Sequence, residues 1–574
     1  MATSHHKEAS EKSAGTSRPG QGGGILKSRV GLVLLLVGTL GLGIVVGFWM
    51  PDDDYFALRK NFQIFGAVYE ELIGGYVDPL DPEHLMRTGI DAMLQDLDPY
   101  TTFIDEAENT DIDIITRGQY GGVGLNIGIR DGKVIVVSPI EGTSGYKQGV
   151  RTGDVITEIE GREAGTLTVN DIRNLMRGEP GTGVNIVIER EGEPEPLHFL
   201  LTRQQVKLKN VTYGGFADEQ AGIGYIKLER FARDVGAETR AALQELKKSG
   251  RLNGLILDLR DNPGGLLEGA VEVAQLFVPQ GSVIVSTRGR HPQTERVYRS
   301  KLPPIAPDVP LVVLVNDLSA SASEIVAGSL QDLDRAVILG TTTFGKGLVQ
   351  IIKPLPYNTS IKLTTSKYYT PSGRSIQSID YGMHDGSQVA VPDSLRRTFR
   401  TAAGRAVRDG SGIEPDVLVA PGMQSELEKA LMRRAAFFFF ANHFAAENPH
   451  IDPDFTASDE LLDQFRAWLE GREFTYRTDA ERAVASLEDA LAANGYDAAL
   501  DEVEALSEAV YAEKRSDFDR YSTDLKEHLR AEIVARYYGE SAQIEASFAH
   551  DRQVTSAIEL LRDSSRYASI LSPL

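Results

Sequence analysis

The sequence predicts a multidomain α/β protein with helical regions before and after its α/β part. Residues 254–258 and 311–315 are short apolar runs, each followed by a loop and then a helical pattern. Strands buried on both faces of a sheet have this character, and their alternation with helices is typical of α/β architecture. From residue 424 onward strand patterns give way to Ala, Leu, Glu and Arg at helical spacing. The 574 residues leave room for about four domains of roughly 150 residues each.

Composition and motifs exclude several classes of function. The formal net charge is −22, from 60 basic and 82 acidic residues, which disfavours a nucleic-acid partner because phosphate binding needs clustered Lys and Arg. The chain has no cysteine, so it can form neither disulfides nor thiolate zinc sites, and it has no cysteine nucleophile. It also lacks a His-Glu-x-x-His zinc motif and a Walker-type Gly-Lys-Ser/Thr. We therefore expect no metal, no ATP and no other cofactor.

The first fifty residues predict a short tail followed by a membrane anchor. Residues 1–29 are polar and rich in Gly, Ser and Lys, which is typical of a disordered tail. Residues 30–50 then run for 21 positions without a charge, long enough to cross a hydrocarbon layer of about 30 Å. Lys27 and Arg29 precede this run and three aspartates follow it, so the positive-inside rule keeps the tail in the cytoplasm.

A cleaved signal peptide is the alternative interpretation of this segment. The run is longer than a typical h-region, and Gly-Phe-Trp at 47–49 is no small-residue cleavage site. We therefore expect a single-pass protein of the inner (cytoplasmic) membrane. The rest of the chain would then lie on the extracytoplasmic side, in the periplasm of a Gram-negative-like bacterium.

Residues 55–110 predict a small helical unit. Apolar residues recur there at helical spacing in two stretches, which are Phe62, Phe65, Val68 and Leu72, and then Leu85, Ile90, Met93 and Leu94. Pro99 interrupts the pattern, because the residue before a proline is biased away from helical geometry.

Residues 115–204 predict a domain of short strands with one helix. Strand patterns cover residues 125–129, 134–137 and 184–189, with a turn at Asp131-Gly132 and a helix over 169–176. This order of elements resembles a PDZ domain over its whole length. The segment Gly121, Gly122, Val123, Gly124 and Leu125 stands where that family keeps its carboxylate-binding loop. Glycines let backbone N–H groups converge on an anion, and the strand that follows can pair with an extended peptide.

Three segments within residues 205–420, the predicted α/β core, carry the residues suited to chemistry. They are Asp-Leu-Arg-Asp-Asn-Pro-Gly-Gly at 258–265, Ser-Ala-Ser-Ala-Ser-Glu at 319–324, and Thr-Phe-Gly-Lys-Gly-Leu-Val-Gln at 343–350. Taken singly, each has a structural explanation: a turn, a helix N-cap and a solvated loop. The first two, however, follow buried strands, and the carboxyl ends of such strands are where α/β proteins place their sites.

These segments, in this order and spacing, resemble the carboxy-terminal processing proteases, also called tail-specific proteases, and the resemblance covers residues 55–420. It implies that Ser321 is the nucleophile, Lys346 the general base and Gln350 the group that orients the lysine. It also implies an oxyanion hole formed by the backbone N–H of Ala322 with that of Gly264 or Gly265. The membrane anchor is common in this family, whereas the long C-terminal helical region is not part of its core pattern.

The chemistry of these residues fits those roles. A serine hydroxyl needs an adjacent base to take its proton, and a lysine can act as that base only when its pKa falls far below about 10.4. Phe344, Leu348 and Val349 are suitable apolar walls for such a lysine. A serine at a helix N-terminus also meets free N–H groups that can hold an oxyanion. The choice of Ser321 over Ser319 and Ser323 rests on spacing alone.

Two alternatives remain beside the Ser–Lys protease. A Ser-His-Asp site would need His291 or His384, the two histidines between residues 205 and 420, and neither lies in the three segments. A membrane-tethered PDZ scaffold with a silent protease core is the alternative from another class. Degenerate relatives lose the serine or the lysine, whereas this chain keeps both.

The resemblance implies that the PDZ domain captures proteins with exposed apolar C-termini and delivers their tails to Ser321. Arg177 is a candidate for coupling peptide binding to activity, although an arginine at a helix end can simply satisfy terminal carbonyls. Residues 425–574 predict helices, the first a long one that begins with a Ser425/Glu428 capping box. The four phenylalanines at 437–440 would lie in this helix, in the core or against a partner. The helical regions could cap the site, form a homo-oligomer or dock an adaptor.

Overall fold

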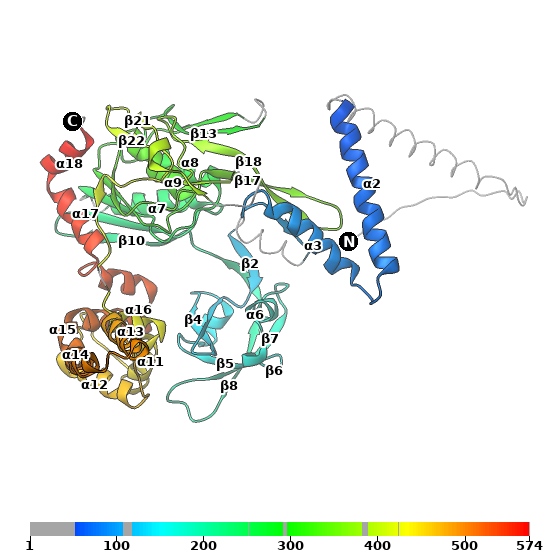
Figure 1. Cartoon of the computed structure of the whole chain (residues 1–574). Coiled ribbons are helices and arrows are strands. Elements are labelled where there is room, and N and C mark those ends of the chain that lie inside the picture. The colour runs from blue at the N-terminus through cyan, green and yellow to red at the C-terminus, as the bar shows by residue number, and fades with distance from the viewer. Residues whose placement is uncertain are drawn as a thin grey trace, which may run out of the picture. The chain divides into compact units, whose positions relative to one another are not determined.

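The computed structural model describes residues 52–106, 118–248, 250, 252–290, 295–381, 389–422 and 424–572. The predicted tail (1–29) and membrane anchor (30–50) lie outside these residues. Within the described part of the chain, none of the helices has the length and apolar character needed to span a bilayer. The chain divides after Ala92 into two compact units (Figure 1).

Two helices dominate the N-terminal unit: α2 (Asp52–Gly75) and α3 (Pro82–Gln95). The Asp81 carboxylate accepts the backbone N–H of Glu83 at 3.0 Å and so caps α3. The hydroxyl of Tyr69 in α2 donates to the carbonyl of Pro82 at 2.8 Å, which joins the helices. Further along, residues 102–104 form a strand, β1 (Thr102–Ile104), although they lie inside the stretch predicted to be helical. A three-residue strand is too short to show an alternating pattern.

The PDZ-like domain is an antiparallel sheet with strand order β3-β4-β5-β7-β8, and β6 pairs with β5. The predicted strands and helix are present at the expected positions. Val136, Ile156 and Ile186 form part of its buried core. Helix α6 begins at a capping box between Thr168 and Asp171. The elements are β2 (Gln119–Gly122), β3 (Leu125–Arg130), β4 (Lys133–Pro139), α5 (Ser144–Lys147), β5 (Val155–Ile159), β6 (Arg162–Glu163), η1 (Ala164–Thr166), α6 (Val169–Met176), β7 (Gly183–Glu189), β8 (Leu197–Thr202) and β9 (Gln204–Lys207).

The α/β core is built on a six-stranded sheet in the order β10-β11-β12-β15-β16-β23, parallel from β11 onward. Leu255 and Val313 pack in one hydrophobic cluster with α7, α8 and α9, while Ile256 and Val312 belong to a second cluster with α17 (Arg552–Arg562). Both faces are therefore covered, which explains the apolar runs in the sequence. The elements are β10 (Val211–Asp218), β11 (Ile223–Leu228), α7 (Val235–Lys248), β12 (Gly254–Asp258), α8 (Leu267–Ala274), β15 (Leu311–Val315), α9 (Ala322–Asp332), β16 (Val337–Gly340) and β23 (Val417–Leu418).

A second sheet adjoins this core, with the order β1-β18-β13-β14 and with β17 also pairing with β18. Through it, strand β1 comes to lie beside β18, which pairs with β17, the strand in which the third sequence segment ends. The remaining elements of the core are β13 (Val283–Gly289), β14 (Arg296–Arg299), β17 (Leu348–Pro354), β18 (Ser360–Tyr369), β19 (Ile379–Asp380), β20 (Val389–Ala390), η3 (Asp393–Leu395), β21 (Thr398–Arg400) and β22 (Ala406–Arg408).

The C-terminal region is helical, as predicted, and it opens with the expected capping box. Ser425 Oγ accepts the N–H of Glu428 at 3.1 Å, and Glu428 Oε2 accepts the N–H of Ser425 at 2.7 Å. The predicted long helix is two helices, because Ala435 takes a left-handed conformation (φ 49°) after α10. The phenylalanines therefore lie in α11, where most of them are buried in the core. The helices are α10 (Glu426–Arg433), α11 (Ala436–Glu447), α12 (Asp459–Glu470), α13 (Asp479–Asn494), α14 (Asp497–Arg515), α15 (Asp517–Arg520), α16 (Ser522–Ser547), α17 (Arg552–Arg562) and α18 (Ser564–Leu571).

Candidate active site

The first two sequence segments meet at one edge of the parallel sheet, where β12 and β15 end. The carbonyl of Asn262 accepts the N–H of Ala320 at 3.1 Å and the hydroxyl of Ser323 at 2.8 Å. Gly264 has φ 100°, and a Cβ at that position would lie 2.9 Å from Ser321 Cβ. Only glycine fits there without strain. The turn of residues 259–265, called the oxyanion turn below, is thus packed directly against the start of α9.

The structure gives separate grounds for choosing among the three serines, which the sequence distinguished by spacing alone. Ser319 and Ser323 are fully buried, and their hydroxyls donate to the carbonyls of Leu259 and Asn262, both at 2.8 Å. Ser321 is partly exposed, and its hydroxyl proton has no acceptor among the described residues. Its backbone is strained, with φ 54° and ψ −109°, at the N-cap of α9. The geometry therefore favours Ser321 as the reactive hydroxyl.

Backbone N–H groups suited to an oxyanion lie beside Ser321. The N–H of Gly264 is already used, because it donates to Asn262 Oδ1 at 2.9 Å. Neither the N–H of Gly265 nor that of Ala322 has an acceptor within the described part of the chain. Of the two predicted glycines, Gly265 is therefore the better candidate to share the oxyanion hole with Ala322.

Glu324 joins the second and third segments, and sequence reasoning missed this role. Its carboxylate is fully buried, and Oε2 accepts the N–H of Ser321 at 2.7 Å and that of Lys346 at 2.9 Å. Oε1 accepts the N–H of Gly345 at 2.7 Å and the hydroxyl of Thr343 at 2.6 Å. Burial raises the pKa of Glu324 to about 7, although these hydrogen bonds oppose the shift. The available signal in the sequence was that Glu324 is the only charged residue between Asp317 and Asp332.

Lys346 lies between β16 and β17, half-buried. Burial lowers the pKa of its amine, and the charge of Lys362 lowers this pKa further, while Asp98 and Glu324 oppose the shift. The expected walls are only partly correct: Leu348 is buried, but Phe344 is 45% exposed. An unpredicted wall comes from Tyr100, whose ring centroid lies 4.1 Å from Lys346 Nζ.

The segment before β1 holds Tyr100 in place. Asp98 Oδ1 accepts the backbone N–H groups of Tyr100 and Thr101, both at 2.9 Å. The same oxygen accepts the hydroxyl of Thr364 at 3.2 Å, and Thr364 Oγ1 in turn accepts the Gln350 amide at 3.2 Å. Among the described residues, no hydrogen bond joins Gln350 to Lys346, so its predicted orienting role remains a prediction. In the sequence, Tyr100 directly follows Pro99, which interrupts the helical pattern, and nothing there indicated a contact with Lys346.

The predicted peptide-binding segment is part strand and part loop. Gly121 and Gly122 belong to β2, which pairs with β9, and Leu125 begins β3. Gly124 has φ 76°, and a Cβ there would lie 2.3 Å from Thr143 Oγ1. In the described part of the chain, the N–H groups of Val123 and Gly124 have no acceptor. Two backbone donors thus remain for a ligand carboxylate beside β3, the edge strand of its sheet.

Arg177 caps the end of α6, and its guanidinium lies 5.3 Å from the ring centroid of Tyr120 in β2. Burial raises the pKa of Tyr120, and the charges of Arg177 and Arg230 counteract the shift. An isolated antiparallel bridge also links Arg177 to Gly122. Arg177 thus ties the helix end to the strand before the predicted peptide-binding loop, and its coupling role remains a prediction.

Three protein families match this chain. Residues 222–389 match "Peptidase family S41", residues 135–190 match "PDZ domain", and residues 427–561 match "Probable PDZ-protease, C-terminal helical domain". The carboxy-terminal-processing protease of Bartonella bacilliformis is 40% identical over 323 residues, covering 56% of this chain and 73% of that protein. The carboxyl-terminal-processing protease of Synechocystis sp. is 35% identical, covering 52% and 70%. A structure titled photosystem II D1 C-terminal processing protease is 28% identical, covers 62% of this chain and 92% of its own, and has a TM-score of 0.33.

Proposed function

The chain belongs to the carboxy-terminal processing proteases of peptidase family S41, and we propose that it is an extracytoplasmic endopeptidase that cuts protein tails with a Ser321–Lys346 dyad. The main support for the dyad is the Glu324 carboxylate, which accepts the backbone N–H groups of both Ser321 and Lys346 and so holds the two residues close together. The free hydroxyl of Ser321 and the lowered pKa of Lys346 support the same assignment. The proposed location rests on the charge-free run at 30–50 and the charges that flank it.

The proposed reaction passes through an acyl-enzyme. Ser321 Oγ forms a bond to the scissile carbonyl carbon while its proton passes to the neutral amine of Lys346. The N–H groups of Ala322 and Gly265 stabilise the oxyanion that develops. The Lys346 ammonium then gives its proton to the leaving amine as the C–N bond breaks. A water molecule, deprotonated by Lys346, hydrolyses the ester and restores Ser321.

Tail capture is proposed to occur on the PDZ domain. An extended tail can pair with the open edge of β3 while its carboxylate accepts the N–H groups of Val123 and Gly124.

A disordered reporter protein with an apolar C-terminus should therefore be cut. Amidation of its terminal carboxylate should raise KM about 10-fold or more with kcat unchanged, because charge-assisted hydrogen bonds to the PDZ domain are lost. Steady-state kinetics of the two reporters measure this. Equal KM values would contradict carboxylate capture, and tail binding without cutting would favour the scaffold alternative.

Two glycine variants localise the effect. In Gly124→Ala the added methyl group would collide with Thr143, so we expect the same rise in KM as on amidation. Gly161, in the turn between β5 and β6, has a similar φ of 71° and open space around it, so Gly161→Ala carries comparable backbone strain at a position outside the predicted peptide-binding loop and should keep the wild-type KM. Right-side-out spheroplasts that produce the protein should also cut the added reporter, because the anchored site would face outward.

The Tyr100 ring is expected to set the pH at which Lys346 becomes a base. A ring face attracts the ammonium form by about 0.5–2 kcal/mol, which opposes the effect of burial. Tyr100→Leu should therefore lower the pKa seen in the kcat/KM profile, so that the rise in activity moves to lower pH. Tyr100→Phe keeps the ring and should keep the profile. An unchanged or raised pKa in Tyr100→Leu, measured from pH 5 to 10, would argue against this role.

A further inference from the structure

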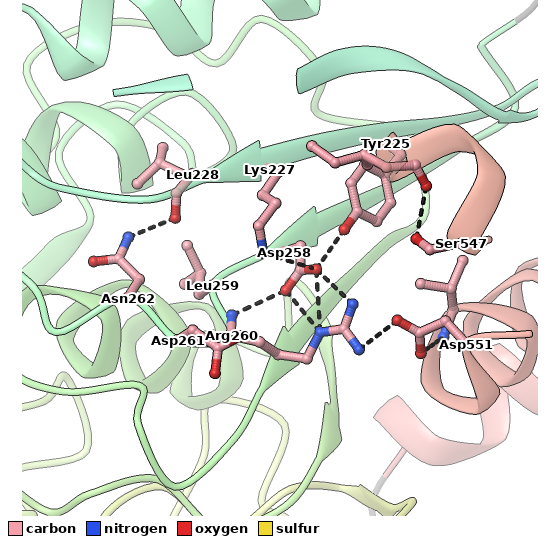
Figure 2. A network of polar contacts seen from close by, with 12 residues as sticks. Tyr225, Lys227, Leu228, Asp258, Leu259, Arg260, Asp261, Asn262, Ser547 and Asp551 are labelled. Carbon is pink, nitrogen blue, oxygen red and sulfur yellow. Dashed lines mark hydrogen bonds and ion pairs between the residues drawn. The ribbon is translucent and has the colours of Figure 1, made fainter. Parts of the chain in front are cut away.

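A buried ion cluster lies at the base of the oxyanion turn (Figure 2). Asp258, the last residue of β12, is fully buried and accepts Arg260 Nε at 2.9 Å and Arg260 Nη2 at 2.6 Å. Its carboxylate also accepts the Tyr225 hydroxyl and lies 3.8 Å from Lys227 Nζ. One carboxylate thus faces two cations, and a second anion is needed to balance them.

The second anion comes from the C-terminal region. Asp551 Oδ2 lies 2.7 Å from Arg260 Nη1, and Gln553 Oε1 accepts the same nitrogen at 2.9 Å. The other oxygen of Asp551 caps α17 by accepting the N–H groups of Gln553 and Val554 at 2.9 and 3.1 Å. Asp551 therefore fixes the start of α17 and holds the free end of the Arg260 guanidinium.

The segment around α17 packs as part of the protease core. Val554, Ala557 and Leu560 are buried in the cluster that covers the second face of the six-stranded sheet. The Phe548 ring lies 4.7 Å from that of Tyr225, measured between centroids. The Tyr567 hydroxyl donates to the carbonyl of Leu311 at 3.0 Å. In Figure 1, α17 and α18 accordingly lie along the core rather than with the preceding helices.

The cluster is connected to the site through a short stretch of chain. Asp258 Oδ1 also accepts the backbone N–H of Arg260 at 2.9 Å, so the cluster fixes where the turn leaves β12. Gly264 follows within the same turn, against Ser321 and Ala322, and Gly265 comes next, beside Phe231. We propose that Asp551, acting through Arg260, is a positioning residue for the oxyanion turn, which makes residues 548–571 a required part of the catalytic core. This inference rests on the proposed function.

The test is Asp551→Asn in the full chain. Asparagine is isosteric and caps helices as well as aspartate does, so α17 should stay in place while the charge is lost. We expect kcat for the tail reporter to fall about 10-fold with KM unchanged, because a charge-assisted hydrogen bond is weakened. The rate at which a fluorophosphonate probe phosphonylates Ser321, with loss of fluoride, should fall by the same factor, since the phosphonyl oxygen of the probe occupies the oxyanion hole. Gln553→Met loses the neutral contact to Arg260, and with it the hydrogen bond that Gln553 Nε2 donates to the carbonyl of Val419 at 2.7 Å, and should lower both rates about threefold.

Arg562→Gln is the matched control. Arg562 pairs with Asp218 at the far end of α17, so its loss weakens helix docking without touching Arg260. It should keep both rates. Wild-type rates in folded Asp551→Asn and Gln553→Met would overturn this inference and leave the proposed function standing. An equal loss of rate in Arg562→Gln would do the same. A wild-type protein that neither reacts with the probe nor cuts the reporter would refute the proposed function, and this inference with it.

Discussion

Replacing Lys346 by methionine is expected to lower kcat for the tail reporter by about 10²- to 10⁴-fold, which is the contribution of a positioned general base. Methionine keeps the apolar stem that packs in the half-buried site, so the fold should persist while the amine is lost. Tail binding to the PDZ domain should not change. Steady-state kinetics together with tail-binding anisotropy measure the two effects separately.

Lys353 provides the matched control for this substitution. It lies on β17, the strand that follows Lys346, and its side chain is exposed. Lys353→Met should therefore keep the wild-type kcat. If Lys346→Met retained wild-type kcat, another group would have to deprotonate Ser321, and the dyad would be wrong.

Glu324→Gln is expected to lower kcat about 100-fold and to destabilise the fold by about 1–3 kcal/mol. Each of the two carboxylate oxygens of Glu324 accepts two hydrogen bonds. The side-chain NH₂ group of the glutamine must therefore face hydrogen-bond donors in either orientation of the amide. The backbone of Ser321 and that of Lys346 would no longer share an anchor. Chemical denaturation and kinetics on the same preparation measure both effects.

Asp332→Asn separates stability from catalysis. Asp332 lies on the same helix, fully buried, and pairs with Arg374 at 2.9 Å, away from the dyad. Its loss should destabilise the fold, yet kcat should stay near wild type while the protein is folded. An equal fall in kcat for Asp332→Asn and Glu324→Gln would show that Glu324 affects catalysis only through the stability of the fold.

Glu324 also gives a pH dependence of stability with a definite sign. Because burial raises its pKa to about 7, the folded state holds a proton that the unfolded state loses near pH 4.5. Its contribution is therefore fully present below pH 4.5 and is lost as pH rises through about 7, by up to about 3 kcal/mol. Denaturation of wild type and Glu324→Gln from pH 4.5 to 8 should show the difference between them shrinking. A constant difference would contradict the raised pKa.

Features with a local signal could be predicted from the sequence. The buried strands at 254–258 and 311–315 follow from continuous apolar runs, and the Ser425 cap follows from residue types three positions apart. The sequence also predicts that the segments after these two strands lie close together, because parallel strands end at one edge of a sheet. The PDZ-like order of strands could also be predicted, because each strand and turn has its own local sequence pattern.

Features that depend on distant segments could not be predicted. Tyr100 reaches Lys346 only because β1 pairs with β18, and a three-residue strand has no periodicity to detect. The anchoring role of Glu324 depends on hydrogen bonds to a distant segment, and the choice between Gly264 and Gly265 depends on the conformation of the turn, in which Gly264 donates to Asn262. The break at Ala435 has no sequence signal, since alanine favours helix. Asp551 lies far from Arg260 in the sequence, and only the fold brings the two side chains together.

The central claim is that Ser321 is the nucleophile and Lys346 its base, and the most direct test is mass spectrometry of the full chain after reaction with a fluorophosphonate probe. The probe should modify Ser321 in the wild-type protein and should leave Lys346→Met essentially unmodified in the same time. Modification of Ser319 or Ser323 instead, or wild-type labelling of Ser321 in Lys346→Met, would contradict the Ser–Lys assignment.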